Sequence, residues 1–91
     1  MGIAGDCYTT EYEGHRIQLI RNNLTKTLTL RIDDTDVASE SRVLPHNITL
    51  IGMIEHQGTQ HTVTAKSVIR RLLFTTDTIE VDGIILPLVK C

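Results

Sequence analysis

Histidines are the side chains best suited to chemistry near neutral pH, because the imidazole changes charge in that range. The chain has four, and they are His15, His46, His56 and His61. A two-residue turn at Gln57-Gly58 would place His56 and His61 on one face of a hairpin. A zinc site needs more ligands in a tetrahedral arrangement. The spacing therefore favours turn and surface histidines over a metal centre, and no residue is assigned as a metal ligand.

The hydroxyl and carboxylate side chains show no catalytic pattern. Ser39, Ser41 and Ser67 lie outside any nucleophile-elbow motif. The aspartates of residues 33–36 could do acid–base chemistry or bind Ca²⁺ weakly. However, neighbouring aspartates after an apolar stretch are typical of turns. We therefore expect no enzyme activity, no catalytic residue and no cofactor.

The two cysteines, Cys7 and Cys91, lie near opposite ends of the chain without C-x-x-C spacing. We expect free thiols, because no other feature indicates an oxidising compartment. The alternative is a bridge that ties the two ends together and closes a long loop. Residues 1–6 do not resemble a signal peptide, and no segment approaches the ~20 apolar residues of a membrane helix. These features predict a cytoplasmic location without membrane binding.

Composition favours a single β-domain. The chain has 91 residues, of which 41% are hydrophobic, with no Trp and one Phe. Ile, Leu, Val and Thr dominate, and these residues fit a pleated, half-buried surface. The net charge is −2 and the basic residues are scattered, which disfavours nucleic acid as a partner. We expect a flexible lead-in over residues 1–10 and one domain over residues 11–91.

Alternation of apolar and polar residues predicts strands joined by tight turns. One strand begins at His15, and a second, over residues 27–32, ends at a turn. Asp82-Gly83 between apolar segments is typical of a type I′ turn, which needs positive φ at both central residues. The predicted turn residues are Asp33, Asp34, Gln57, Gly58, Asp82 and Gly83.

The remaining stretches give less regular patterns. Residues 35–47 suggest a short strand near Val37 and then a loop. Residues 48–54 are apolar enough to be buried on both faces, although Ile51 and Met53 fall on the polar face of the predicted hairpin. In that hairpin Gly52 lies opposite Val63. Residues 66–74 fit a strand or a short helix, and the flanking strands favour a strand.

Two blocks of the chain resemble each other. Residues 15–34 and 61–83 both run strand, linker, strand and Asp turn. Stacked hairpins of this kind predict an all-β fold, either an antiparallel sandwich or a small barrel, of about seven to eight strands.

The same blocks resemble the Fas apoptotic inhibitory molecule family. The similar segments are residues 13–19, 30–34, 61–65, 70–71 and 78–83, with Ser67 and Pro87. The family usually has two such domains and more aromatic strands, so the chain is similar to a remote, single-domain member. The resemblance implies a cytosolic β-sandwich without catalytic residues. It also implies a protein-interaction role connected with apoptosis inhibition or with protection against aggregation.

The leading functional hypothesis is a non-enzymatic protein-interaction domain. Edge strands of a sheet can pair with an added strand, so we expect an unidentified protein partner or a homo-oligomer formed through an edge strand. Two alternatives remain. The aliphatic stripes could line a cavity for a small hydrophobic ligand or lipid, or the histidines could make a weak metal-binding domain.

Overall fold

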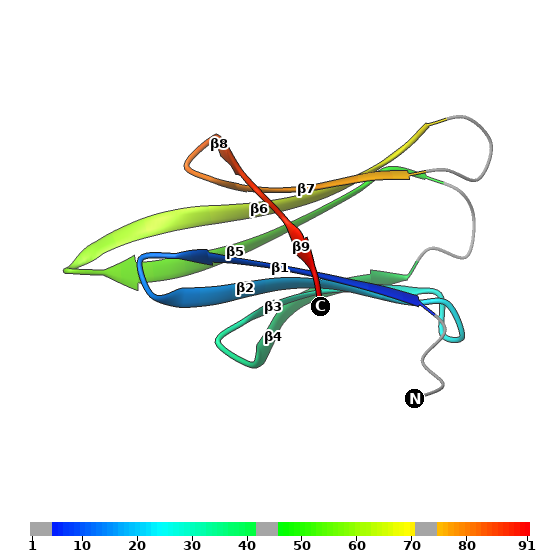
Figure 1. Ribbon diagram of the computed structural model, residues 1–91, viewed down its shortest axis with the longest axis horizontal. Helices are drawn as coiled ribbons and strands as arrows, with labels where there is room; N and C mark the ends of the chain where they lie inside the picture. Colours follow the sequence, from blue (N-terminus) through cyan, green and yellow to red (C-terminus); the bar gives the residue numbers. More distant parts are fainter. Residues whose placement is uncertain (1–4, 42–45, 71–74) are drawn as a thin grey trace.

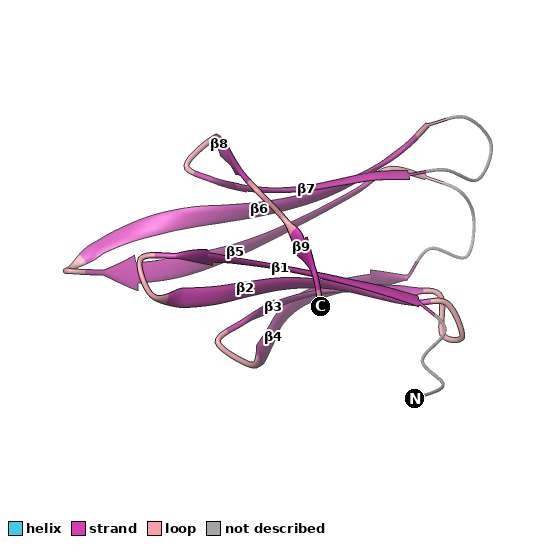
Figure 2. Ribbon diagram, viewed as in Figure 1, coloured by secondary structure: helices cyan, strands magenta, loops and turns pink. Residues whose placement is uncertain are grey.

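The structure is a computed structural model that describes residues 5–41, 46–70 and 75–91. Within these ranges the chain forms strands and turns without a helix (Figure 2). No helix in the described part of the chain is long and apolar enough to cross a membrane. The strands are β1 (Gly5–Tyr12), β2 (His15–Asn22), β3 (Thr27–Ile32), β4 (Thr35–Ser41), β5 (Ile48–His56), β6 (Thr59–Ile69), β7 (Thr75–Val81), β8 (Ile84–Leu86) and β9 (Val89–Lys90).

The strands form two antiparallel sheets that pack face to face as a sandwich (Figure 1). The first sheet has the order β4-β3-β2-β1-β9, and the second has the order β5-β6-β7-β8. The all-β sandwich is thus confirmed, and the barrel alternative is not. The nine strands of the described ranges exceed the expected seven to eight, because β1 and β9 were not predicted.

The expected flexible lead-in over residues 1–10 is wrong for residues 5–10, which belong to β1. This strand pairs with β2 along its whole length, from Gly5 opposite Asn22 to Tyr12 opposite His15. Its side chains on the core face are polar or aromatic, so the apolar alternation that predicts a strand is missing. The remaining lead-in residues, 1–4, lie outside the described ranges.

Within the described part of the chain, four hairpins close through two-residue turns with positive φ at both positions. That backbone matches the right-handed twist of the flanking strands. The turns are Glu13-Gly14, Asp33-Asp34, Gln57-Gly58 and Asp82-Gly83. The last three are the predicted turns, and the β5–β6 register has Gly52 opposite Val63 as the sequence predicts.

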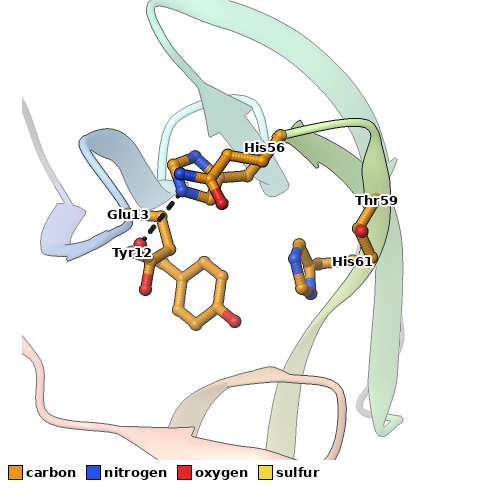
Figure 3. A pocket seen from close by; sticks show the side chains of 6 residues that line it. Tyr12, Glu13, His56, Thr59 and His61 are labelled. Atoms are coloured by element: carbon orange, nitrogen blue, oxygen red, sulfur yellow. Dashed lines mark ion pairs between the residues drawn. The ribbon is translucent and has the colours of Figure 1, made fainter.

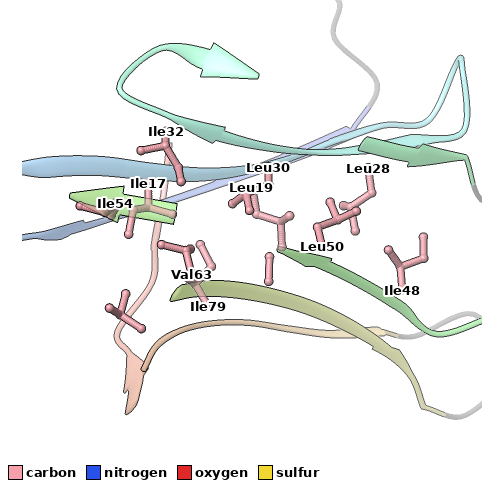
Figure 4. Packing of buried hydrophobic residues seen from close by; sticks show 12 residues of the cluster. Ile17, Leu19, Leu28, Leu30, Ile32, Ile48, Leu50, Ile54, Val63 and Ile79 are labelled. Carbon is pink, nitrogen blue, oxygen red and sulfur yellow. The ribbon is translucent and has the colours of Figure 1, made fainter. Parts of the chain in front are cut away.

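The core lies between the sheets and consists almost entirely of aliphatic side chains from β2, β3, β5, β6 and β7 (Figure 4). Its buried members are Ile17, Leu19, Leu28, Leu30, Ile32, Ile48, Leu50, Ile54, Val63, Ala65, Ile79 and Val81. The expectation that residues 48–54 are buried on both faces is wrong. Burial alternates along β5, and Ile51 and Met53 on its outer face are 59% and 51% exposed.

Two irregular stretches now have assignments. Residues 35–41 form a full strand, β4, which is longer than the short strand expected near Val37. The strand interpretation holds for residues 66–69, which complete β6. Arg70 follows the end of β6, and the last four residues of the ambiguous stretch, 71–74, lie outside the described ranges, as do residues 42–45.

A disulfide joins Cys7 and Cys91, so the expectation of free thiols is wrong. The cause is the position of β9, which pairs antiparallel with the outer edge of β1 through Tyr8–Lys90 and Thr9–Val89. This pairing brings the Cα atoms of the cysteines to 5.2 Å, within the range that a disulfide can span. The bridge was hard to predict because neither β1 nor β9, whose pairing brings the two cysteines together, was predicted.

Candidate functional site

Three of the four histidines meet at one end of the sandwich, where the β1–β2 turn approaches the β5–β6 hairpin. A cleft of about 320 Å³ opens there between the two sheets, lined by Tyr12, Glu13, His56, Gln57, Thr59 and His61 (Figure 3). His15 lies beside the cleft, with its ring centroid 6.4 Å from that of His56. The sequence pattern predicted that His56 and His61 lie on one face of a hairpin, but it did not predict that His15 lies beside them.

Contacts across the cleft link the two sheets. Nε2 of His56 lies 3.2 Å from a carboxylate oxygen of Glu13. The Tyr12 and His61 rings meet edge to face with centroids 5.2 Å apart. His46 is remote from this group and pairs with Glu40 at the end of β4, at 2.8 Å. Among the described residues no group of three or more histidine, cysteine or acidic side chains is arranged to hold a metal ion.

Two of these histidines form matching pairs with the Asp turns. Nδ1 of His15 lies 2.6 Å from a carboxylate oxygen of Asp33, and Nδ1 of His61 lies 2.6 Å from one of Asp82. These hydrogen bonds, with a main-chain N–H bond to each carboxylate, hold the pKa of both aspartates below the usual value. Such pairs orient catalytic and metal-binding histidines in other proteins.

The ladder geometry explains why each turn begins with aspartate. The main-chain N–H of Asp33 donates to the carbonyl of Arg16, at 2.9 Å. Because the chain turns after Asp33, the main-chain carbonyl of Asp33 does not accept a hydrogen bond from the N–H of Arg16 in return. Its carboxylate takes that place and accepts the N–H of Arg16 at 3.0 Å. Asp82 and Thr62 make the same exchange, at 2.9 Å in both directions.

We call each of these arrangements, His15–Asp33 and His61–Asp82, a His–Asp clamp. The two clamps occupy equivalent positions of the two sheets, since Ile17 pairs with Ile32 beside the first and Val63 pairs with Val81 beside the second. Recurrence at the same ladder position indicates that the clamps belong to the fold. Beside its histidines the cleft offers the hydroxyls of Thr59 and Tyr12, the amide of Gln57 and the carboxylate of Glu13, which is already paired with His56.

The other end of the sandwich holds a polar network that the sequence analysis missed. Arg21, on the core face of β2, donates to Asp77 at 2.6 Å, to Thr75 at 3.0 Å and to Asp6 at 3.0 Å. The side chains of Arg21 and Asp77 are only 18% and 6% exposed. The network therefore joins the two sheets by a largely desolvated ion pair.

The signal for this network was present in the alternation pattern. Arg21 extends the core-face series of Ile17 and Leu19. In the same way, Asp77 precedes Ile79 and Val81, and Ser67 follows Val63 and Ala65. Opposite charges at inward positions of two strands are rare unless they are paired, so they predict a contact once the sheets are stacked.

The edge of β5, which ends at the cleft, also exposes apolar side chains. This strand pairs with β6 on one side, and no described strand pairs with its other side. Its outward side chains include Ile51 and Met53, both more than half exposed. The segment from Ile48 to Ile54 carries no charge and no proline. These are properties of a strand that can accept another strand.

The other outermost strands in the described chain are short, charged or tied to a neighbour. β4 carries Asp36 and Glu40, and its ladder with β3 is interrupted by a bulge at Leu30/Arg31. β8 has three residues. β9 has two residues and is tied to β1 by the disulfide. Short strands, charges and bulges all discourage edge pairing, so β5 is the exception.

Comparison of the chain with protein-family models, with curated proteins and with solved structures finds no match. The resemblance to the Fas apoptotic inhibitory molecule family therefore stays a prediction.

Proposed function

We propose that this chain is a protein-interaction domain that binds an extended segment of a partner along β5. The observation that carries the proposal is the edge of β5, which pairs with no described strand on its outer side and carries no charge from Ile48 to Ile54, with Ile51 and Met53 exposed beside it. Main-chain hydrogen bonds would supply affinity in such a complex, and alternate side chains would supply specificity. The partner's outward residues would extend the exposed apolar row of β5.

The alternatives have less support. The aliphatic stripes that could have lined a ligand cavity pack against each other between the sheets (Figure 4), which favours an interaction domain over a carrier. A weak metal site would need ligands beyond the paired histidines of the cleft. The roles in apoptosis inhibition or in protection against aggregation stay predictions, as does the absence of enzyme activity.

The disulfide bears on the predicted cytoplasmic location. Disulfides persist mainly in oxidising compartments and are rare in the reducing cytosol. The Cys7–Cys91 bridge therefore supports a proposal that the domain acts in an oxidising environment. The cytoplasmic alternative requires that the thiols stay reduced in the cell, which mass spectrometry of alkylated protein from its own source would decide.

A selection from a library of random extended peptides tests the interaction function. We expect the folded protein to enrich peptides with alternating apolar residues, and Ile51→Lys to weaken their binding by about tenfold or more, or ~1.4 kcal/mol. Ile85→Lys is the matched control, because Ile85 is an equally exposed isoleucine (64%) on β8. Absence of any enriched peptide, or equal loss with both variants, would contradict the proposal.

A further inference from the structure

The hydrogen-bonding direction of each β5 residue follows from its hairpin. In a two-residue turn the flanking residues, here His56 and Thr59, bond to each other. Antiparallel pairs then alternate between bonded and non-bonded. Thus the even-numbered residues of β5 bond to β6, and the odd-numbered residues direct their main-chain groups to the free edge. These are Thr49, Ile51, Met53 and Glu55.

The same counting can be checked on β1, whose outer edge is occupied. There the odd-numbered residues should face β9. The N–H of Cys91 does donate to the carbonyl of Cys7, at 2.9 Å. Thr9 pairs with Gln18 on β2, and Ile51 pairs with Thr64 on β6. Gln18 and Thr64 are equivalent, because they directly follow the equivalent residues Ile17 and Val63. Thr9 and Ile51 therefore hold equivalent positions in the two sheets. The edge that β9 covers in the first sheet therefore has no described strand on it in the second.

We propose that the partner of this edge is β5 of a second copy, paired antiparallel about Gly52. The inference rests on the proposed interaction function and names its partner. In this register Ile51 lies opposite Met53 of the second copy, and Thr49 lies opposite its Glu55. All of these residues direct their main-chain groups to the edge, so each of these pairs is a hydrogen-bonded pair. The two four-stranded sheets become one continuous sheet.

The side chains of β5 are self-complementary in this register. The exposed Ile51 and Met53 of the two copies form one apolar cluster on the outer face. Glu55, the acidic residue of the strand, faces a threonine rather than a second carboxyl group, so no two acidic side chains oppose each other. A register centred on Ile51 would place Glu55 opposite residue 47, which precedes β5, and would lose a hydrogen-bonded pair. The geometry therefore selects Gly52 as the centre.

Sedimentation equilibrium over a wide range of protein concentration tests the dimer. We expect a reversible monomer–dimer equilibrium whose dissociation constant rises at least tenfold in Ile51→Lys and in Met53→Lys. Ile85→Lys should leave it unchanged. An equimolar mixture of Ile51→Lys and Met53→Glu should restore dimers, because the introduced lysine of one chain would face the introduced glutamate of the other. Circular dichroism of each variant verifies that it remains folded.

Cysteine cross-linking tests the register. Bonded pairs in an antiparallel ladder have Cα atoms about 5.5 Å apart, a distance that a disulfide spans. A mixture of Ile51→Cys and Met53→Cys should therefore cross-link under mild oxidation more than either variant alone. Preferred self-linking of Ile51→Cys would overturn the Gly52 register.

The outcomes separate this inference from the proposed function. A wild-type protein that remains monomeric at every concentration overturns the dimer. So does a dimer that Ile51→Lys and Met53→Lys leave intact. If the monomer still binds selected peptides in a manner that depends on Ile51, the interaction function stands and only the second copy is excluded as the partner.

Discussion

The halves β1–β4 and β5–β8 build the same four-stranded unit, yet they differ at their outer edges and at the far end of the core. Both halves contain two-residue turns and a His–Asp clamp. Among the described strands, β9 covers part of the outer edge of the first half, at Tyr8 and Thr9, and no strand covers the outer edge of the second. The shared features specify the fold. The differences mark the positions where the two halves are not equivalent. These positions include the β5 edge proposed for interaction and the Arg21–Asp77 ion pair between the sheets.

The test with the largest expected effect releases β9 from the edge of β1 in the first half. Replacing both cysteines, as Cys7→Ser/Cys91→Ser, frees β9 and makes the edge of β1 resemble that of β5. The bridge spans 84 residues of sequence, and loss of so long a closed loop should lower the free energy of unfolding by about 4 kcal/mol. Urea unfolding measures the change.

Wild-type protein unfolded under reducing conditions is the control for the cysteine variant and should show the same loss. A change below about 1 kcal/mol in both samples would mean that the bridge scarcely restricts the unfolded chain.

The next test breaks the ion pair between the halves, whose cation comes from the first half and whose anion comes from the second. Arg21 and Ser67 are equivalent positions on β2 and β6, so the cation has no counterpart in the second sheet. Asp77→Ala should cost about 3 kcal/mol, because it leaves the guanidinium of Arg21 partly buried beside one remaining carboxylate. Thermal or urea unfolding detects this loss.

Asp36→Ala is the matched control, since Asp36 also pairs with an arginine at 2.6 Å but at the surface. It should cost less than about 1 kcal/mol. Equal effects of the two variants would mean that burial of Asp77 does not strengthen its contact.

A third test concerns a position where the halves carry different residues. Gly52 in the second half is equivalent to Thr10 in the first half. Thr10 pairs with Ile17 and Gly52 pairs with Val63, and these two partners are themselves equivalent. A Cβ on Gly52 would lie 3.0 Å from both Ile32 Cδ1 and Val37 Cγ2. Gly52→Ala should therefore cost about 1 kcal/mol by overpacking, whereas Thr49→Ala on the outer face should be near neutral. A stabilised Gly52→Ala would contradict this close packing.

The smallest test concerns the feature that the halves share. The folded-state pKa values of Asp33 and Asp82 are lowered by their histidine and main-chain hydrogen bonds. A lowered pKa means that the clamp's contribution is complete above the ordinary carboxyl pKa, about 4, and is lost as the pH falls through the folded-state value. Asp33→Asn and Asp82→Asn should lower Tm at neutral pH and converge with wild type in acid.

Because the clamps are equivalent, the two asparagine variants should behave alike when Tm is measured against pH. Each serves as the other's control. A gap in Tm that closes in acid for only one variant would show that the clamps differ in spite of their matching geometry.

Much of this fold could be predicted from the sequence, because it depends on local patterns. Alternation around Ile17 and Ile79 indicated their strands, and Asp82-Gly83 requires a backbone that only a tight hairpin provides. β1 could not be predicted in this way, since its core face carries polar residues such as Thr10. Without β1 there was no strand to receive β9, and so no reason to join Cys7 and Cys91.

The candidate site was less predictable for a related reason. Register within one hairpin brought His56 near His61, but stacking of the sheets brought His15 and Glu13 to them. The edge of β5 was visible only as Ile51 and Met53 falling outside the alternation. Whether a strand has a neighbour on each side depends on the order of strands in the sheet, which local patterns do not contain.

The His–Asp clamps have a consequence for how the strands find their alignment. A strand that slides by two residues against its neighbour keeps the same side chains on the core face, so hydrophobic packing alone discriminates weakly against that error. In either sheet such a slip would move the histidine away from the aspartate and leave the turn carboxylate without its donors. Each clamp thus favours a single register of three consecutive strands, which are β2–β4 in the first sheet and β6–β8 in the second.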